Sequence, residues 1–277
     1  MNIAKPMAGL TAILCSIGLM TAGTMGAMAD DATPLASSGL PDHIVNGDFE
    51  YPAGLRNANW TLINPETGMK YDFGKVGYWG QWEPIADFDA DLFGWKSTQT
   101  ATADHFGGAQ GAGAVEIQTW GTNIAQIVES QQNTAIYQDV AVIPGAVYTL
   151  SFKHAPMVVP EDNWHTDTMQ VLIGPPGHEE PVEMTRTKSN GYGDKVGETS
   201  TTISTTGNSG GMDFDTYEGV WVCPEDAGPV ARFTFRSLTS HDPTTGNQVD
   251  DISFQVSYPL TYELNGGAGV IPNKEVE

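Results

Sequence analysis

The sequence predicts an all-β protein built as a two-sheet antiparallel sandwich. Residues 137–154 form two alternating apolar and polar runs on either side of Pro144-Gly145, which is the pattern of two strands joined by a tight corner. The chain of 277 residues also contains 32 glycines and 17 prolines, as expected for many short strands and turns. Apolar patterns with a helical period are absent after the N-terminus.

The corner between the two runs has its own residue signature. Tyr148, Leu150 and Phe152 occupy alternate positions, so the second strand should bury one face. Proline at position 144 sets the φ angle of the first central turn position, and glycine at 145 accepts the positive φ that a type II turn needs at the second. A sharp turn is therefore expected here, and the two strands are expected to pair as a hairpin.

The N-terminus has the features of a secretory signal peptide over residues 1–29. Lys5 supplies a positive charge, residues 8–20 form an apolar run, and Ala27-Met28-Ala29 is an A-x-A cleavage site before Asp30. The alternative is a membrane anchor, but glycines and threonines interrupt the run early. We therefore expect a secreted or cell-surface protein that is not inserted in a membrane after signal removal. Residues 30–42, directly after the signal segment, are expected to be a linker.

The charge of the chain restricts its partners. It has 34 acidic and 12 basic residues, a formal charge of −22 that becomes −23 without the signal segment. Such a surface repels nucleic acid and anionic membranes and attracts cations such as Ca²⁺. Without residues 1–29, only Cys223 remains, so no intramolecular disulfide is expected.

Other strands are marked by shorter alternating runs. The segment 51–93 lacks a clear period and is expected to be an elaborated loop. Outside the central pair, the predicted strands are 43–50, 93–98, 115–118, 167–174, 201–205, 221–222, 231–238 and 246–254.

Several ordered motifs point to one family. The runs Q-D-V, P-G and Y-T-L-S-F within 138–152 resemble the central hairpin of jelly-roll carbohydrate-binding modules of the 4/9/22 type, and N-G-x-F-E at 46–50 resembles their first strand. The ending G-N-x-x-D-D-I-x-F at 246–254, with His154 and the D-T-M run at 167–169, is similar to a variety found in bacterial surface proteins. The resemblance covers Val45 to Phe254, departs over 51–93, and implies a jelly-roll domain over residues 43–258.

The remaining tail, residues 259–277, has a different resemblance. The run L-T-Y-E-L-N-G-G-A-G at 260–269 looks like the beginning of an internalin-type B repeat, of which only the first strand and turn are present. The tail is expected to be either part of a longer surface protein or a free strand.

The family resemblance also implies a structural calcium ion. In such modules the glutamate of the opening motif and a nearby backbone carbonyl contribute ligands, and Glu50 and Gly47 occupy those positions here. Asp250 is expected on the inward face of the closing strand, together with Ile252 and Phe254, where a carboxylate is costly unless a cation neutralises it. The expected ligands are Gly47, Glu50 and Asp250, with Asp48 and Asp251 as alternatives if the register differs by one residue.

Aromatic side chains suggest where a glycan would bind. Sugar rings stack on exposed aromatic faces, and several rings lie in segments that look like loops. Trp60, Trp95 and Trp221 are expected in the core. The candidate ligand-binding residues are Tyr78, Trp79, Trp82, Trp120 and Trp164.

The sequence gives no catalytic constellation. A phosphate-binding glycine loop and the zinc motif H-E-x-x-H are absent. The run G-N-S-G-G at 207–211 matches the letters of the nucleophile motif G-x-S-x-G, but no helical apolar pattern follows it, and that motif needs a strand, a turn and a helix. The histidines, His154 among them, lack metal-ligand spacing, so each is expected to be a polar residue satisfied by hydrogen bonds. We therefore expect a non-catalytic, adhesin-like domain that binds a glycan or another extracellular ligand, on a host or cell-wall surface. The alternatives are a structural spacer without a ligand site and a glycan-active enzyme.

Overall fold

The structure of the chain is a computed structural model. The chain separates into two units, Met1–Pro34 and Leu35–Glu277. All described residues belong to the second unit, and none of their helices is long and apolar enough to cross a membrane. The described residues are 39–55, 59–72, 81–100, 111–119, 121–127, 133–157, 165–192, 195–207, 214–241, 243 and 245–257.

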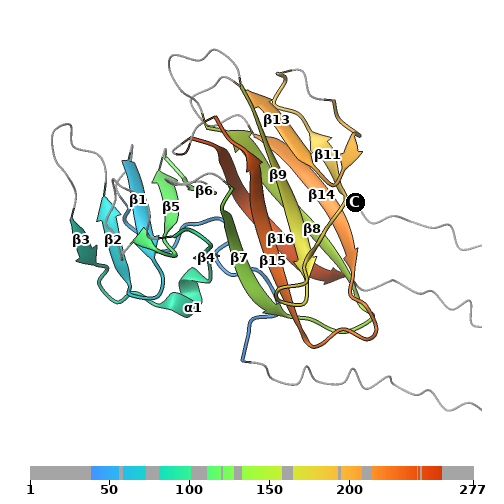
Figure 1. Cartoon of the computed structure of the whole chain (residues 1–277), viewed down its shortest axis with the longest axis horizontal. Coiled ribbons are helices and arrows are strands. Elements are labelled where there is room, and N and C mark those ends of the chain that lie inside the picture. The colour runs from blue at the N-terminus through green and yellow to red at the C-terminus, as the bar shows by residue number, and fades with distance from the viewer. Residues whose placement is uncertain are drawn as a thin grey trace, which may run out of the picture. The chain divides into compact units, whose positions relative to one another are not determined.

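Two antiparallel β-sheets make up the described residues, which confirms the predicted jelly-roll β-sandwich (Figure 1). Sheet A has the strand order β12-β11-β14-β8-β16-β6-β5-β1-β2-β3. Sheet B has the order β10-β9-β15-β7-β4, with β13 paired to β9. The strands of sheet A are β1 (Asn59–Asn64), β2 (Met69–Asp72), β3 (Trp82–Pro84), β5 (Val115–Thr119), β6 (Asn123–Gln126), β8 (Val147–Pro156), β11 (Met184–Lys188), β12 (Thr199–Ser200), β14 (Asp215–Val222) and β16 (Asn247–Ser257). Those of sheet B are β4 (Lys96–Ser97), β7 (Ala135–Ala141), β9 (His165–Gly174), β10 (Glu180–Pro181), β13 (Ile203–Gly207) and β15 (Val230–Thr239), and the short helix α1 spans Ala90–Phe93.

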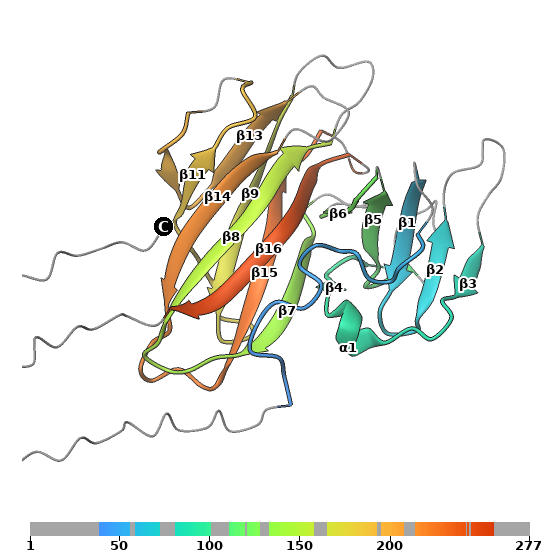
Figure 2. The ribbon, with the colours of Figure 1, turned by 180° about the vertical axis from the view of Figure 1, so that it is seen from behind.

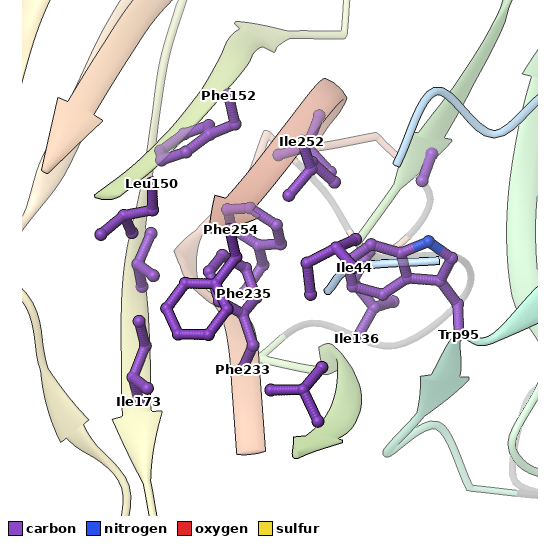
Figure 3. Close-up of a cluster of buried hydrophobic side chains, with 14 of the residues drawn as sticks. Ile44, Trp95, Ile136, Leu150, Phe152, Ile173, Phe233, Phe235, Ile252 and Phe254 are labelled. Atoms are coloured by element: carbon purple, nitrogen blue, oxygen red, sulfur yellow. The ribbon is translucent and has the colours of Figure 1, made fainter. Parts of the chain in front are cut away.

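The core lies between the two sheets and is rich in aromatic rings (Figure 3). Phe152 from β8 meets Phe235 from β15 edge to face, with ring centroids 4.9 Å apart. Tyr148 stacks on Phe254 of β16 at 4.7 Å. Trp95 is fully buried beside Phe235, as the sequence predicted for this residue. Such ring pairs add to the free energy gained by burying apolar area, so β8, β15 and β16 form the centre of the fold.

The two central strands lie where the sequence predicted them, but they do not pair with each other. The predicted turn is present, because Ala146 N–H donates to Ile143 O and Gly145 has a φ of 78°. However, β7 pairs with β15 in sheet B, whereas β8 pairs with β14 and β16 in sheet A. The prediction of a hairpin is therefore wrong: the turn carries the chain from one sheet to the other.

The segment 51–93 was expected to be a loop, and instead it extends sheet A. Strand β1 pairs with β5, and β2 and β3 follow as further antiparallel neighbours. The β1–β2 turn is fixed by Asn64, whose side-chain Oδ1 accepts hydrogen bonds from the N–H groups of Glu66 and Thr67. Both faces of β1 are used: Ile63 joins the main core, and Leu62 packs in a second, smaller cluster.

The opening segment 43–50 is also different from its prediction as a strand. It forms turns, with Asn46 and Phe49 at positive φ. The backbone of Val45 is hydrogen-bonded by a side chain in place of a neighbouring strand. Gln138 Oε1 accepts a hydrogen bond from Val45 N–H, and Gln138 Nε2 donates one to Val45 O. Gly47 O accepts a hydrogen bond from Ile252 N–H at 2.9 Å, which ties the segment to β16.

A buried polar network joins two of the sequence motifs. His154 is fully buried, and its Nε2 lies 2.8 Å from Asn247 Oδ1. Asn247 Nδ2 faces three oxygen atoms, on Thr168, Ser237 and Thr239, which fixes the amide orientation. His154 Nε2 must therefore donate, and Nδ1 accepts from the Thr205 hydroxyl at 2.7 Å. The prediction that His154 is a satisfied structural histidine is confirmed.

Candidate functional site

The first candidate region is the junction where the opening segment meets β16. Glu50 Oε1 accepts hydrogen bonds from the Thr122 hydroxyl at 2.7 Å and from Asn123 N–H at 3.0 Å. Asp250 is 5% exposed, and its Oδ1 accepts from Asp251 N–H at 2.8 Å. The predicted ligands Gly47, Glu50 and Asp250 thus all lie on the two segments that meet here.

A β-bulge changes the expected face of Asp250. The register of β16 against β8 shifts between Asp250 and Ser253, and Asp251 adopts a φ of 49°. Asp250 lies opposite Lys153, whereas Ile252 points into the core, so the prediction that the two share one face is wrong. A bulge adds one residue to one strand and thereby reverses the alternation beyond it.

The carboxyl of Asp250 is electrostatically unfavourable as an anion. Burial, together with the charges of Asp251 and Glu50, raises the pKa of Asp250 to about 7, and Lys153 opposes this shift only in part. Lys153 itself forms an ion pair with Asp251. The junction therefore concentrates negative charge that a cation would relieve. Among the described residues, however, no group of three or more acidic, histidine or cysteine side chains is placed to hold a metal ion.

Two buried groups with opposite pKa shifts make stability depend on pH. Burial lowers the pKa of His154 to about 4, so its contribution is complete above about pH 6.5 and is lost toward pH 4. The raised pKa of Asp250 acts in the opposite sense. The contribution of Asp250 to the free energy of unfolding is present below about pH 3.8 and is lost as the pH rises toward 7.

We predict that Asp250→Asn separates these two effects. In chelator, the variant should be more stable than the parent at pH 7.5 by about 2 kcal/mol, because no buried carboxyl has to ionise. On acidification from pH 6.5 to 4 the variant should lose up to about 3 kcal/mol through His154, whereas in the parent the contribution of Asp250 grows over the same range and offsets much of this loss. Urea unfolding at several pH values measures both, and parallel curves for the two proteins would contradict the assignment.

The second candidate region is an open groove on the outer face of sheet A. It has a volume of about 730 Å³ and is formed by residues of β8, β11, β12, β14 and β16. Figure 2 shows β14, β8 and β16 side by side, with sheet B behind them. This volume is in the range of small-molecule sites in proteins. We call it the outer groove, and its lining residues are Thr149, Leu150, Ser151, Glu183, Thr185, Thr187, Thr199, Glu218, Gly219, Val220 and Ser253.

One row of hydrogen-bonding side chains crosses the outer groove at right angles to the strands. Pairing places Thr199 opposite Thr185, Thr185 opposite Glu218, Glu218 opposite Ser151, and Ser151 opposite Ser253. Directly paired residues point to the same face, and neighbouring strands are about 4.8 Å apart, so the row extends over about 19 Å. Five adjacent strands each contribute one polar group to this row.

Inward neighbours hold the row in place. Leu150, Met184 and Tyr217 alternate with the row residues and are at most 3% exposed in the core. On the outer side, the Thr185 and Thr199 hydroxyls are 2.9 Å apart, and Thr187 donates to Glu218 Oε1 at 3.3 Å. The outer groove therefore presents fixed hydroxyls and a carboxylate on a rigid sheet, an arrangement that can bind a ligand rich in hydroxyl groups.

The predicted aromatic residues lie elsewhere or outside the described residues. Trp82 is in β3, at the edge of sheet A, and its ring centroid is 5.7 Å from that of Tyr71. Trp60, expected in the core, is 42% exposed instead. It shares a face of β1 with Leu62, which packs in the second cluster and not in the main core. Tyr78, Trp79, Trp120 and Trp164 lie outside the described residues, so they remain predictions.

Sequence reasoning missed the residues of the outer groove. Polar residues that alternate with buried ones are usually read as a solvated face, and the T-x-S run at 149–151 and T-x-T run at 185–187 were part of that pattern. The signal that could have found them is the repetition of hydroxyl-bearing residues on strands that turn out to be neighbours. That neighbour relation is set by sheet topology and is not visible in the chain order.

Comparisons with known proteins give only distant similarities. No protein-family model matches the sequence. No curated protein matches it significantly. Among solved structures, a CBM4 carbohydrate-binding module has 16% identity and a TM-score of 0.31, over 52% of this chain and 75% of its own. The CBM22-1 xylan-binding domain of Paenibacillus barcinonensis Xyn10C has 11% identity and a TM-score of 0.31, over 51% of this chain and 80% of its own. The N-terminal cellulose-binding domain of Cellulomonas fimi β-1,4-glucanase C has 15% identity and a TM-score of 0.30, over 61% and 91%.

Proposed function

We propose that this chain is an exported, non-catalytic, cell-surface domain that binds a glycan in the outer groove. The observation that carries the proposal is the row of five polar side chains across five adjacent strands. Sugars present hydroxyl groups at regular intervals along a chain, and fixed hydroxyls and carboxylates on a sheet can pair with them. The signal-peptide features of residues 1–29 support export.

The outer groove favours binding over hydrolysis. Its two carboxylates, Glu183 and Glu218, are both exposed. The general acid of a glycosidase stands in apolar surroundings that keep its proton in place, and these positions do not supply such surroundings. The spacer alternative predicts no ligand at all, so a binding measurement separates it from the proposal.

A glycan array with the full chain tests the proposal. We expect binding to a set of glycans that is weakened roughly 10- to 30-fold by the double substitution Ser151→Ala with Glu218→Ala, because each lost hydrogen bond contributes about 1 kcal/mol. Gln255→Ala is the matched control, since Gln255 is exposed on β16 opposite Thr149 but does not line the groove. Absence of any glycan hit would support the spacer, and release of reducing ends from a bound glycan would support an enzyme.

The same proposal includes a structural calcium ion at the junction of the opening segment and β16. Glu50 and Asp250 carry the charge, and the Gly47 carbonyl has a second lone pair beside the one that accepts from Ile252. Calcium needs six to eight oxygen ligands, so water and other groups would complete the shell. The ion would neutralise the buried Asp250 carboxylate and join the two ends of the domain.

We predict that calcium raises the melting temperature of the parent protein. A ligand present at about 100 times its Kd adds about 2.7 kcal/mol, which corresponds to several degrees for a domain of this size. Glu50→Gln and Asp250→Asn should each remove most of this shift, whereas Asp226→Asn, on an exposed turn, should keep it. A melting temperature that is equal in calcium and in chelator would remove the ion from the account.

A further inference from the structure

The charged side chains of the outer groove all have one sign. Six of its lining residues carry hydroxyl groups and two carry carboxylates, and no lysine, arginine or histidine is among them. On the same face of β8, the base nearest in sequence to the groove residue Ser151 is Lys153, which is engaged by Asp251. A ligand in the groove therefore meets acceptors and negative charge, without a cation from these residues to balance an acidic group.

The two carboxylates come from neighbouring parts of sheet A, Glu218 from β14 and Glu183 from the position directly before β11. Glu218 stands in the middle of the polar row, between Thr185 of β11 and Ser151 of β8. Glu183 is two residues before Thr185, and the buried Met184 lies between them, so the two side chains leave the same face of the sheet. A sugar bound at Thr185 would therefore have the Glu218 carboxylate beside it across the strands and the Glu183 carboxylate beside it along the chain.

Carboxylates restrict the chemistry of what they bind. An ionised carboxylate only accepts hydrogen bonds, so the ligand must donate. A sugar hydroxyl can donate, but an ammonium group donates and also carries the opposite charge. A uronic or sulfated sugar would be repelled, both by these two groups and by the field of a chain with a net charge of −22.

We propose that the outer groove selects glycans that carry free amino groups, such as deacetylated amino-sugar chains, over neutral and acidic glycans. This inference rests on the proposed glycan-binding function and names the ligand class of the same groove. The row of hydroxyls orients the chain across the strands, and Glu183 and Glu218 provide the preference for the charged amine.

The test compares oligosaccharides that differ only at the amine. The full chain is titrated with β-1,4-linked glucosamine oligomers, with the N-acetylated oligomers of equal length, and with an oligouronate. Exposed charge pairs are worth roughly up to fivefold in affinity each, so at low salt we expect the free amine to bind about tenfold tighter than the acetylated form. The preference should shrink in about 0.5 M salt, where charges are screened beyond a few ångströms.

Variants distinguish the groove from the acidic surface as a whole. Glu183→Gln with Glu218→Gln should abolish most of the preference while acetylated oligomers still bind, and Glu225→Gln on an exposed turn should leave it intact. Equal loss in both variants would mean non-specific attraction of a polycation and would overturn the inference. Equal affinity for the two oligomers in the parent would also overturn it and leave the proposed function standing. No binding of any glycan would instead contradict the proposed function itself.

Discussion

Gly47→Ala should destabilise this protein more than any other single methyl group added to a described glycine. A Cβ at position 47 would lie 2.1 Å from Ile252 O and 3.1 Å from Ile252 C, and both are backbone atoms of β16. The chain cannot relieve this overlap by a rotamer change. It must separate the opening segment from β16 and lose the hydrogen bond between Ile252 N–H and Gly47 O. We expect a loss of about 3 kcal/mol or more in the free energy of unfolding.

Gly228→Ala is the control for this substitution. No atom lies within 4 Å of a Cβ built at position 228, so this variant should stay within about 0.5 kcal/mol of the parent. Urea unfolding of the three proteins measures the difference. Equal stabilities of the two variants would show that the opening segment is not held against β16.

Arg186→Met should be the most damaging change in the interior. The guanidinium of Arg186 is 5% exposed, and its Nε lies 2.8 Å from Oδ2 of Asp215, which is fully buried. Arg186 also contacts Tyr217 and Ser204 O, so the pair belongs to the network that supports β11 and β14 under the outer groove. Loss of one partner from a buried ion pair costs about 3–5 kcal/mol, because the other charge stays buried.

A partly exposed ion pair provides the comparison. Arg232 makes a two-pronged contact with Asp139 on sheet B, but both side chains are more than 20% exposed. Arg232→Met should therefore cost about 1 kcal/mol or less. If Arg186→Met does not fold, Arg186→Met with Asp215→Asn should recover part of the stability. Equal losses for the two arginine variants in urea unfolding would contradict the role given to the buried pair.

The sequence predicted local structure where short-range chemistry decides it. The turn at Pro144-Gly145 and the strands around it follow from φ preferences and alternation, and both are present. The buried Trp95 and the structural role of His154 were also predicted correctly. In each case the residue type and its immediate neighbours carry the information.

The errors come from long-range partners. Strands β7 and β8 belong to different sheets because each finds its partners far along the chain, and alternation alone does not name those partners. The opening segment is not a strand because the Gln138 side chain occupies the place of a neighbouring backbone. The inward position of Asp250 was wrong because one extra residue at the bulge reverses the faces of β16.

The candidate site shows the same division. The acids of the junction could be named from sequence, because the motifs at both ends of the domain contain them. The polar row of the outer groove could not, because its members are spread from Ser151 to Ser253 and meet only through the order β12-β11-β14-β8-β16.

Glycan binding in the outer groove can be located directly by following the backbone amide signals of the full chain during titration with an array-positive glycan. The account predicts that the largest chemical-shift changes occur at Ser151, Thr185, Glu218 and Ser253, on four neighbouring strands of sheet A. Saturable changes confined to sheet B, or to β1, β2 and β3, would contradict it.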